Sequence, residues 1–173
     1  MHPSSVWVAQ CLLNPAHPDF KKIVIGKWLA QGGKRDKIVL ATKLGSEMGE
    51  VMKGLSAKYM VEAVEASLKR LQTDYIDLYQ VHFYDPTTPI DETLQALDDV
   101  VRSGKVRYVG CSNFLAYRLA RALGRSEARN LVRLDSVQPR YNLLFREIER
   151  ELLPLCAEEG IGVIPYNPLA GGL

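Results

Sequence analysis

Six polar residues of the sequence could take part in acid–base chemistry or bind an amide, and each stands at or just after the end of a short, largely apolar run. They are Lys43, His82, Ser112, Asn113, Gln138 and Tyr166. Lysine and histidine can polarise or protonate an oxygen atom near neutral pH. Serine, asparagine and glutamine offer paired donors and acceptors that suit an amide, and a tyrosine ring offers a stacking face. Together these residue types would suit a nicotinamide ring with its carboxamide.

Metal and covalent chemistries find little support in the same pattern. The sequence has no clustered carboxylates beside these residues and no G-x-S-x-G motif, so neither a metal site nor a serine nucleophile is expected. Cys11, Cys111 and Cys156 are odd in number, far apart and without C-x-x-C spacing. This usage argues against a disulfide framework or a zinc site and favours a reducing compartment, with core packing as the default role of the thiols.

Predicted strands place the six residues. The clearest strand covers Tyr75 to His82, where Ile76, Leu78 and Val81 supply an apolar body and the proline-containing run 84–89 ends it. Similar runs predict strands over residues 36–43, 106–111, 134–137 and 161–166. Each of these strands ends at or beside one of the six polar residues.

Helical patterns separate the strands. After Asp19, a fair N-cap, a core-facing helix is predicted from the spacing of Phe20, Val24, Ile25, Trp28 and Leu29. Ser56 is expected to cap a second helix with one buried stripe, formed by Met60, Val61, Val64, Leu68 and Leu71.

Three further helices complete the alternation. Thr88, followed by Pro89, predicts the N-cap of a helix that residues 103–105 close. Another helix is predicted over residues 115–123, with Gly124 as its end. The last spans residues 148–159, where Pro154 either kinks the helix or lies in its first turn.

Strands that recur about every 30 residues with one helix between them are typical of βαβ units and a parallel sheet. A doubly wound nucleotide-binding sheet would normally carry a glycine-rich G-x-G-x-x-G turn, which the sequence lacks. The other architecture with this rhythm is a (β/α)₈ barrel or part of one. In either case the carboxyl ends of the strands lie on one face, so the six polar residues are predicted to form one site.

Composition adds exclusions. The 173 residues suit one domain, and a formal net charge of +2 with interspersed acids and bases predicts neither a nucleic-acid nor an anionic-membrane partner. The longest apolar run, Val6 to Leu13, is far shorter than the roughly 20 residues of a membrane span. We therefore expect a cytoplasmic protein with no membrane segment, in which residues 1–18 form an irregular lead-in to a domain over residues 19–173.

Four stretches of the chain resemble the aldo-keto reductases. They are residues 37–45, 67–82, 104–114 and 164–173, and the sequence over residues 44–53 and 167–169 looks most like the bacterial and potassium-channel-β-like branches. The resemblance implies a (β/α)₈ barrel that uses NADPH to reduce aldehydes and ketones by direct hydride transfer.

The resemblance also implies roles for single residues. Lys43 looks like the lysine that lowers the pKa of a catalytic tyrosine, and His82 like the histidine that binds the substrate carbonyl oxygen. Ser112, Asn113 and Gln138 resemble the contacts to the nicotinamide carboxamide, and Tyr166 resembles the ring that stacks on the nicotinamide. The segment Asn167, Pro168, Leu169 resembles the start of the pyrophosphate-binding loop.

The chain departs from the family pattern in two respects. The family's catalytic tyrosine lies in a D-T-A-x-x-Y type segment before the lysine strand, and no tyrosine precedes Lys43 here. Five predicted strands also fall short of the eight of a complete barrel, so the expected fold is an incomplete α/β barrel of about five parallel β/α units. Its open sheet edges predict marginal stability, self-association or partial disorder. Two hypotheses remain open: a piece of a carbonyl reductase, or a non-catalytic cofactor-sensing or interaction protein derived from one.

Overall fold

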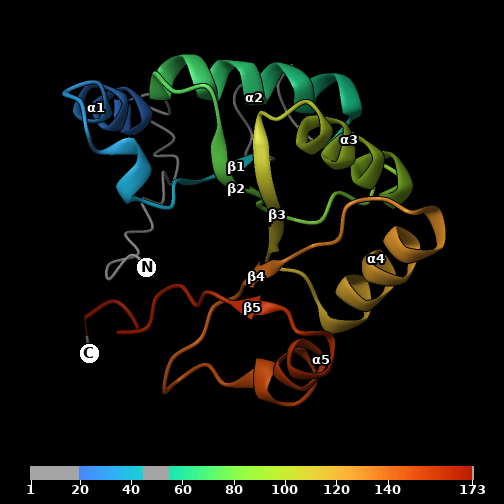
Figure 1. Cartoon of the computed structure of the whole chain (residues 1–173). Helices are drawn as coiled ribbons and strands as arrows, with labels where there is room; N and C mark the ends of the chain where they lie inside the picture. Colours follow the sequence, from blue (N-terminus) through green and yellow to red (C-terminus); the bar gives the residue numbers. More distant parts are fainter. Residues whose placement is uncertain (1–19, 45–54, 173) are drawn as a thin grey trace.

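Five parallel strands form one sheet in the order of the sequence (Figure 1). The computed structural model describes residues 20–44 and 55–172, so the expected lead-in, the Asp19 cap and the stretch 45–53 lie outside the described residues. The strands are β1 (Ala41–Leu44), β2 (Ile76–Val81), β3 (Val106–Ser112), β4 (Ser136–Gln138) and β5 (Gly162–Val163). Each pairs in parallel with the next. The predicted strands at 36–43 and 161–166 are therefore present but shorter than expected.

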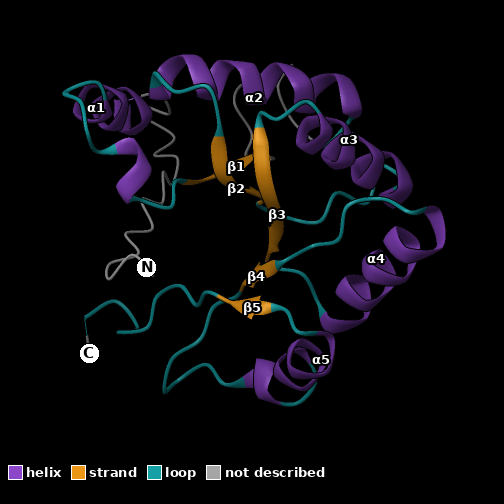
Figure 2. Cartoon of the chain, viewed as in Figure 1, coloured by secondary structure: helices purple, strands orange, loops and turns teal. Residues whose placement is uncertain are grey.

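One helix precedes the sheet, and one helix follows each of the first four strands. The α-helices are α1 (Phe20–Leu29), α2 (Ala57–Leu71), α3 (Ile90–Arg102), α4 (Ala116–Arg129) and α5 (Leu152–Glu159), with short 3₁₀ helices η1 (Arg35–Lys37) and η2 (Glu147–Glu149). Figure 2 shows α2, α3, α4 and α5 along one side of the curved row of strands. A doubly wound sheet carries helices on both faces. Five parallel β/α units with helices on one side are instead part of a (β/α)₈ barrel, as the sequence predicted.

The apolar core lies between the sheet and these helices. Tyr79 and Val81 of β2 and Val109 of β3 are fully or nearly fully buried there. The expected stripe of α2 is confirmed at Met60, Val64, Leu68 and Leu71, whereas Val61 is 46 % exposed. Cys111 and Cys156 are buried members of the core, in agreement with the packing role expected for them.

The face that α1 presents was predicted correctly only in part. Leu29 is buried and Ile25 packs against the core, as expected, whereas Val24 and Trp28 are 46 % and 42 % exposed. The reason is Gly26, because a methyl group at this position would overlap the backbone carbonyl oxygen of Arg70 in α2. The helix packs on α2 through its glycine, at a backbone distance that larger side chains would prevent.

Several predicted helix ends also differ. The N-cap of α3 is Pro89, because the Thr88 hydroxyl donates to Asp85 Oδ2 (2.6 Å) instead of capping the helix. Helix α4 continues through Gly124 and ends at Arg129, and the C-cap residue Asn130 takes a left-handed conformation (φ 53°). Pro154 lies in the first turn of α5, where no intrahelical N–H is needed, so the helix starts there and is not kinked.

None of the helices in the described segments combines the length and apolar character that a bilayer crossing requires. The same segments contain no group of three or more histidine, cysteine or acidic side chains placed to hold a metal ion.

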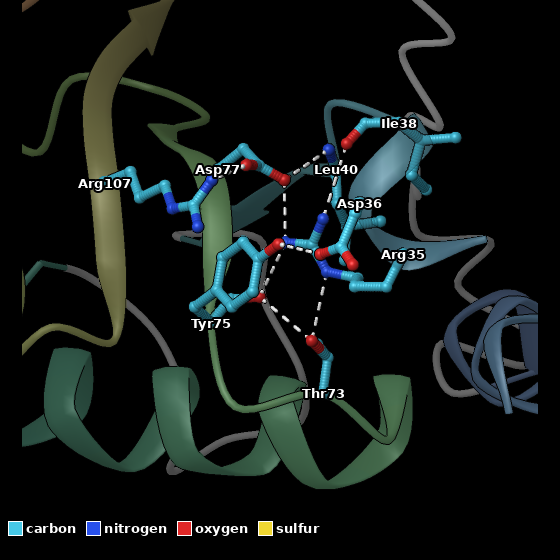
Figure 3. A network of polar contacts seen from close by, with 8 residues as sticks. All are labelled: Arg35, Asp36, Ile38, Leu40, Thr73, Tyr75, Asp77 and Arg107. Carbon is cyan, nitrogen blue, oxygen red and sulfur yellow. Dashed lines mark hydrogen bonds and ion pairs between the residues drawn. The ribbon is translucent and has the colours of Figure 1, made fainter. Parts of the chain in front are cut away.

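The amino ends of the strands are tied together around Asp77 (Figure 3). Its carboxylate accepts from Leu40 N (2.9 Å) and pairs with Arg35 (2.7 Å) and Arg107 (3.2 Å). Both guanidinium groups also stack on the Tyr75 ring, at 3.7 and 3.9 Å from its centroid. One buried carboxylate thus joins η1, the approach to β1, β2 and β3.

This network predicts that two sets of ion pairs contribute differently to the stability of the fold. Asp77→Ala removes the acceptor of a buried N–H and leaves two arginines without their carboxylate, so we expect a loss of about 2–4 kcal/mol in the free energy of unfolding, measured with urea. Glu65→Ala, which breaks an exposed pair with Lys105, is the control and should cost less than about 1 kcal/mol. Equal losses in the two variants would contradict a structural role for Asp77.

Candidate functional site

The carboxyl ends of the strands bring most of the predicted residues into one cluster. Lys43 lies in β1, His82 directly follows β2, Ser112 ends β3 and Gln138 ends β4. Ser112 and Gln138 are register partners, and their side chains therefore point to the same face of the sheet. Lys43, Ser112 and Gln138 are all buried, with exposed fractions of 6 %, 0 % and 1 %.

Ser112 is the centre of the hydrogen bonds in this cluster. Lys43 Nζ donates to Ser112 Oγ (3.1 Å), and the Ser112 hydroxyl donates to the backbone oxygen of Gln138 (2.7 Å). Asn113 Nδ2 also donates to Ser112 Oγ (3.2 Å). The hydroxyl therefore uses its one proton and accepts two, which is its full capacity.

Asn113 connects the remaining site residues. Its backbone is left-handed (φ 58°), a conformation that asparagine tolerates better than most residues. From there its side chain donates to the backbone oxygen of His82 (3.2 Å) and accepts from the Tyr166 hydroxyl (3.0 Å). Strands β2 and β3 and the segment after β5 are thereby linked through one amide.

Tyr166 and the segment after it lie at the rim of the cluster. Tyr166 pairs with Arg140 in an isolated parallel bridge, and its N–H donates to the backbone oxygen of Pro139 (2.9 Å). Asn167 has a positive φ of 59°, and its backbone oxygen accepts from Asn142 Nδ2 (3.0 Å). Of the two expected residues that follow, Pro168 is exposed and Leu169 is 68 % exposed, so neither packs into the buried cluster.

Asn142 is a site-forming residue that the sequence did not reveal. It is buried (7 % exposed), and besides holding the 167 backbone its Oδ1 accepts from Leu144 N and Phe145 N, both at 3.0 Å. It lies in an irregular connection between β4 and η2, where no strand or helix pattern marks a residue. A search for polar residues at the ends of predicted strands could not have found it.

Burial sets the charge states of the two candidate catalytic residues. It lowers the pKa of Lys43 to about 8. Burial, followed by repulsion from Lys43, lowers the pKa of His82 to about 4. Near pH 7 the imidazole is therefore neutral, and most Lys43 side chains are charged. Within the described segments, no carboxylate forms an ion pair with Lys43.

The donor set is suited to a nicotinamide, with one qualification in its hydrogen bonds. Two side-chain amides (Asn113, Gln138), a hydroxyl (Ser112) and a half-buried tyrosine ring (Tyr166) converge, which are the groups that a carboxamide and its ring would need. The Ser112 proton already goes to the Gln138 backbone oxygen, and the two Asn113 N–H groups go to the His82 backbone oxygen and to Ser112. Donation from Ser112 or Asn113 to a carboxamide would therefore replace an internal hydrogen bond.

The buried lysine predicts a pH dependence of stability. The folded chain binds the Lys43 proton less tightly than the unfolded chain, so between pH 8 and 10.5 the unfolded state carries more protons and the free energy of unfolding rises with pH. We expect Lys43→Met to be more stable than the unmodified chain at pH 7, and this advantage to shrink by as much as about 3 kcal/mol across that window.

Urea titrations at several pH values test this expectation. Burial raises the pKa of buried thiol and phenol groups, which therefore change the stability in the opposite direction. The difference between variant and unmodified chain is for this reason the quantity to follow. Lys69→Met, at an exposed position of α2, is the matched control. If the difference in unfolding free energy between Lys43→Met and the unmodified chain stayed constant from pH 7 to 11, the lysine would have the same pKa in the folded and unfolded chains, against the expectation.

Comparisons with known proteins agree with this geometry. Residues 21–173 match the sequence profile of the Aldo/keto reductase family. The chain is 46 % identical to the uncharacterized oxidoreductase YrpG of Bacillus subtilis over 157 residues, which cover 87 % of this chain and 48 % of that protein. It is 40 % identical to the aldo-keto reductase YhdN of Bacillus subtilis over 152 residues (87 % of this chain, 44 % of that protein).

A fungal relative, norsolorinic acid reductase A of Aspergillus parasiticus, is 38 % identical over 158 residues, which cover 86 % of this chain and 40 % of that protein. The chain thus spans about half the length, or less, of the curated relatives it matches. The family profile covers nearly all of the described residues, and the fold agrees with it. The chain belongs to the Aldo/keto reductase family.

Proposed function

We propose that the chain supplies the lysine, the histidine and the nicotinamide-binding residues of a reductase that converts aldehydes or ketones to alcohols with NADPH. The observation that carries the proposal is the hydrogen-bonded cluster that joins Lys43, Ser112, Asn113, Tyr166 and the His82 backbone at the carboxyl ends of the strands. Family membership and the names of the relatives, oxidoreductase and aldo-keto reductase, support a reduction.

Each site residue has a separate role in the proposed reduction. NADPH, when bound, supplies the hydride. The neutral His82 imidazole donates a hydrogen bond to the substrate carbonyl oxygen, and the nearby Lys43 ammonium stabilises negative charge that develops on that oxygen. The alkoxide left by hydride transfer then takes its proton from solvent water. Asn113 and Gln138 orient the carboxamide, and the Tyr166 ring stacks on the nicotinamide. The backbone of residues 167–169 approaches the pyrophosphate.

The same proposal takes residues 19–173 as one barrel unit of a cytoplasmic enzyme, whose partners are a small carbonyl substrate and, through the β1 and β5 edges, a further copy of the sheet. No metal, nucleic acid or membrane takes part.

One observation favours a second function for the isolated chain, that of a non-catalytic cofactor sensor. In the described part of the chain no tyrosine hydroxyl bonds to Lys43 Nζ, whose hydrogen bond goes to Ser112. A lysine without a phenol to acidify has no proton donor to tune. Such a chain would bind NADPH and release it unchanged.

Cofactor binding should depend on the Tyr166 ring. We expect NADPH to bind the purified chain, and Tyr166→Leu to weaken binding about fivefold, because a stacked aromatic ring contributes about 1 kcal/mol beyond its buried area. Fluorescence titration of NADPH measures both affinities. Tyr117→Leu, which removes an exposed tyrosine of α4, is the control and should leave the affinity unchanged. Equal affinities in the two variants would remove Tyr166 from the cofactor site.

Turnover should separate the two functions. In a reductase, His82→Gln is expected to lower kcat for an aromatic aldehyde about 100-fold, with little change in NADPH affinity, because the imidazole acts on the carbonyl and not on the cofactor. NADPH oxidation at 340 nm measures kcat. Binding without turnover in the unmodified chain would support the cofactor-sensing function, and full activity in His82→Gln would contradict the role of His82.

A further inference from the structure

One row of paired residues crosses the whole sheet below the candidate site. Successive register pairs join Lys43 to Gln80, Gln80 to Gly110, Gly110 to Ser136 and Ser136 to Gly162. Side chains of one row in a parallel sheet point to the same face. Lys43, Gln80 and Ser136 therefore share a face, with Gly110 between Gln80 and Ser136 and Gly162 beyond Ser136. We call these five residues the lysine row.

Among the described residues, two buried polar groups of the lysine row have no hydrogen-bond partner. Gln80 is 1 % exposed, and its Nε2 finds no acceptor there; Ser136 is 6 % exposed, and its Oγ is likewise unpaired. Leaving such a group unpaired costs on the order of 1–3 kcal/mol, and most buried polar groups in native proteins are paired with protein or with ordered water. Two such groups in one row point to a shared partner.

Gly110 brings these two groups together. A methyl group at this position would overlap Ser136 Oγ and would lie 3.5 Å from Gln80 Cγ, so the serine hydroxyl and the glutamine side chain meet over the glycine. On the other side of Gln80 stands Lys43, whose ammonium group has three N–H bonds, one of them directed to Ser112. Donors outnumber acceptors in the row, and the missing partner must supply an oxygen.

We propose that Gln80 and Ser136 bind an internal water molecule that accepts a hydrogen bond from Lys43, which makes Gln80 a positioning residue for the lysine. A water oxygen accepts from an amide or ammonium and also donates to a hydroxyl, whereas an anion only accepts. Lys43 is then held from two sides, by Ser112 toward the strand ends and by the water within its own row. The water site is independent of the proposed function. Only the statement that Gln80 positions a catalytic lysine rests on that function.

Nuclear magnetic resonance of the full chain tests the water directly. We expect a cross-peak between long-lived water and the side-chain amide protons of Gln80, assigned by its loss in Gln80→Met. A hydrogen bond to water favours the charged lysine, so Gln80→Met should lower the pKa of Lys43 by about half a unit, a threefold change in its proton dissociation constant. Resonances of labelled lysine, followed above pH 7 where the neighbouring His82 is neutral, report that pKa.

Gln95→Met is the matched control, since it removes an exposed amide of α3 that donates to Asp99, and it should change neither readout. Ser136→Ala is the second variant; it keeps the core volume nearly intact and should weaken the water cross-peak and shift the lysine pKa in the same direction. This variant carries the test if Gln80→Met does not fold.

Three results would overturn the proposal. They are the absence of a water cross-peak at Gln80 in the unmodified chain, the same Lys43 pKa in Gln80→Met and Gln95→Met, and a Gln80 amide resonance that moves only with added bromide, which would assign the site to an anion. None of these readouts needs cofactor or turnover. An inactive chain with a long-lived water at Gln80 would reject the reductase function and leave the water site standing.

Discussion

The in-register parallel pairing of the strands is the constraint on which the rest of the structure depends, because it decides which side chains stand beside one another. It places Lys43 next to Gln80 in one row and Ser112 next to Gln138 in the row above. The length of the lysine side chain lets its ammonium cross from the first row to the Ser112 hydroxyl of the second. A shift of one residue in any strand would turn these groups to the helix side and bury them among apolar side chains.

The two ends of the strands have different tasks. At the amino ends, Asp77 and its two arginines form a closed set of hydrogen bonds that orders the first strands. At the carboxyl ends, buried polar groups are linked through single hydroxyl and amide side chains, and Lys43 has no carboxylate partner in the described segments. Barrel enzymes commonly place stability at the amino face and chemistry at the carboxyl face. In this chain the two ends differ in charge compensation: Asp77 has two arginine partners, whereas Lys43 has no carboxylate partner in the described segments.

The sequence predicted the architecture well, because strand and helix periods differ and each strand ends on a polar residue. It predicted that Lys43, Ser112 and Asn113 lie close together, since carboxyl ends of parallel strands lie on one face, but not that Pro168 and Leu169 lie apart from them. It could not predict how they meet: that Ser112 rather than a carboxylate receives Lys43 depends on distances between strands. The exposed residues of α1 were missed because the contact of Gly26 with α2 outweighs local preference. The passage of α4 through Gly124 was missed as well, and no neighbouring atom lies close enough to Gly124 to explain it.

The left-handed backbone of Asn113 limits which amino acids the chain can accept at this position. Glycine would relax the backbone but would leave His82, Ser112 and Tyr166 without the amide that links them. Leucine or valine would strain the backbone and break the link as well. Aspartate tolerates the conformation, yet it lacks the N–H groups that reach Ser112 and the His82 carbonyl. Backbone geometry and side-chain chemistry together leave asparagine as the residue that satisfies both, so variation among functional sequences should be narrowest here.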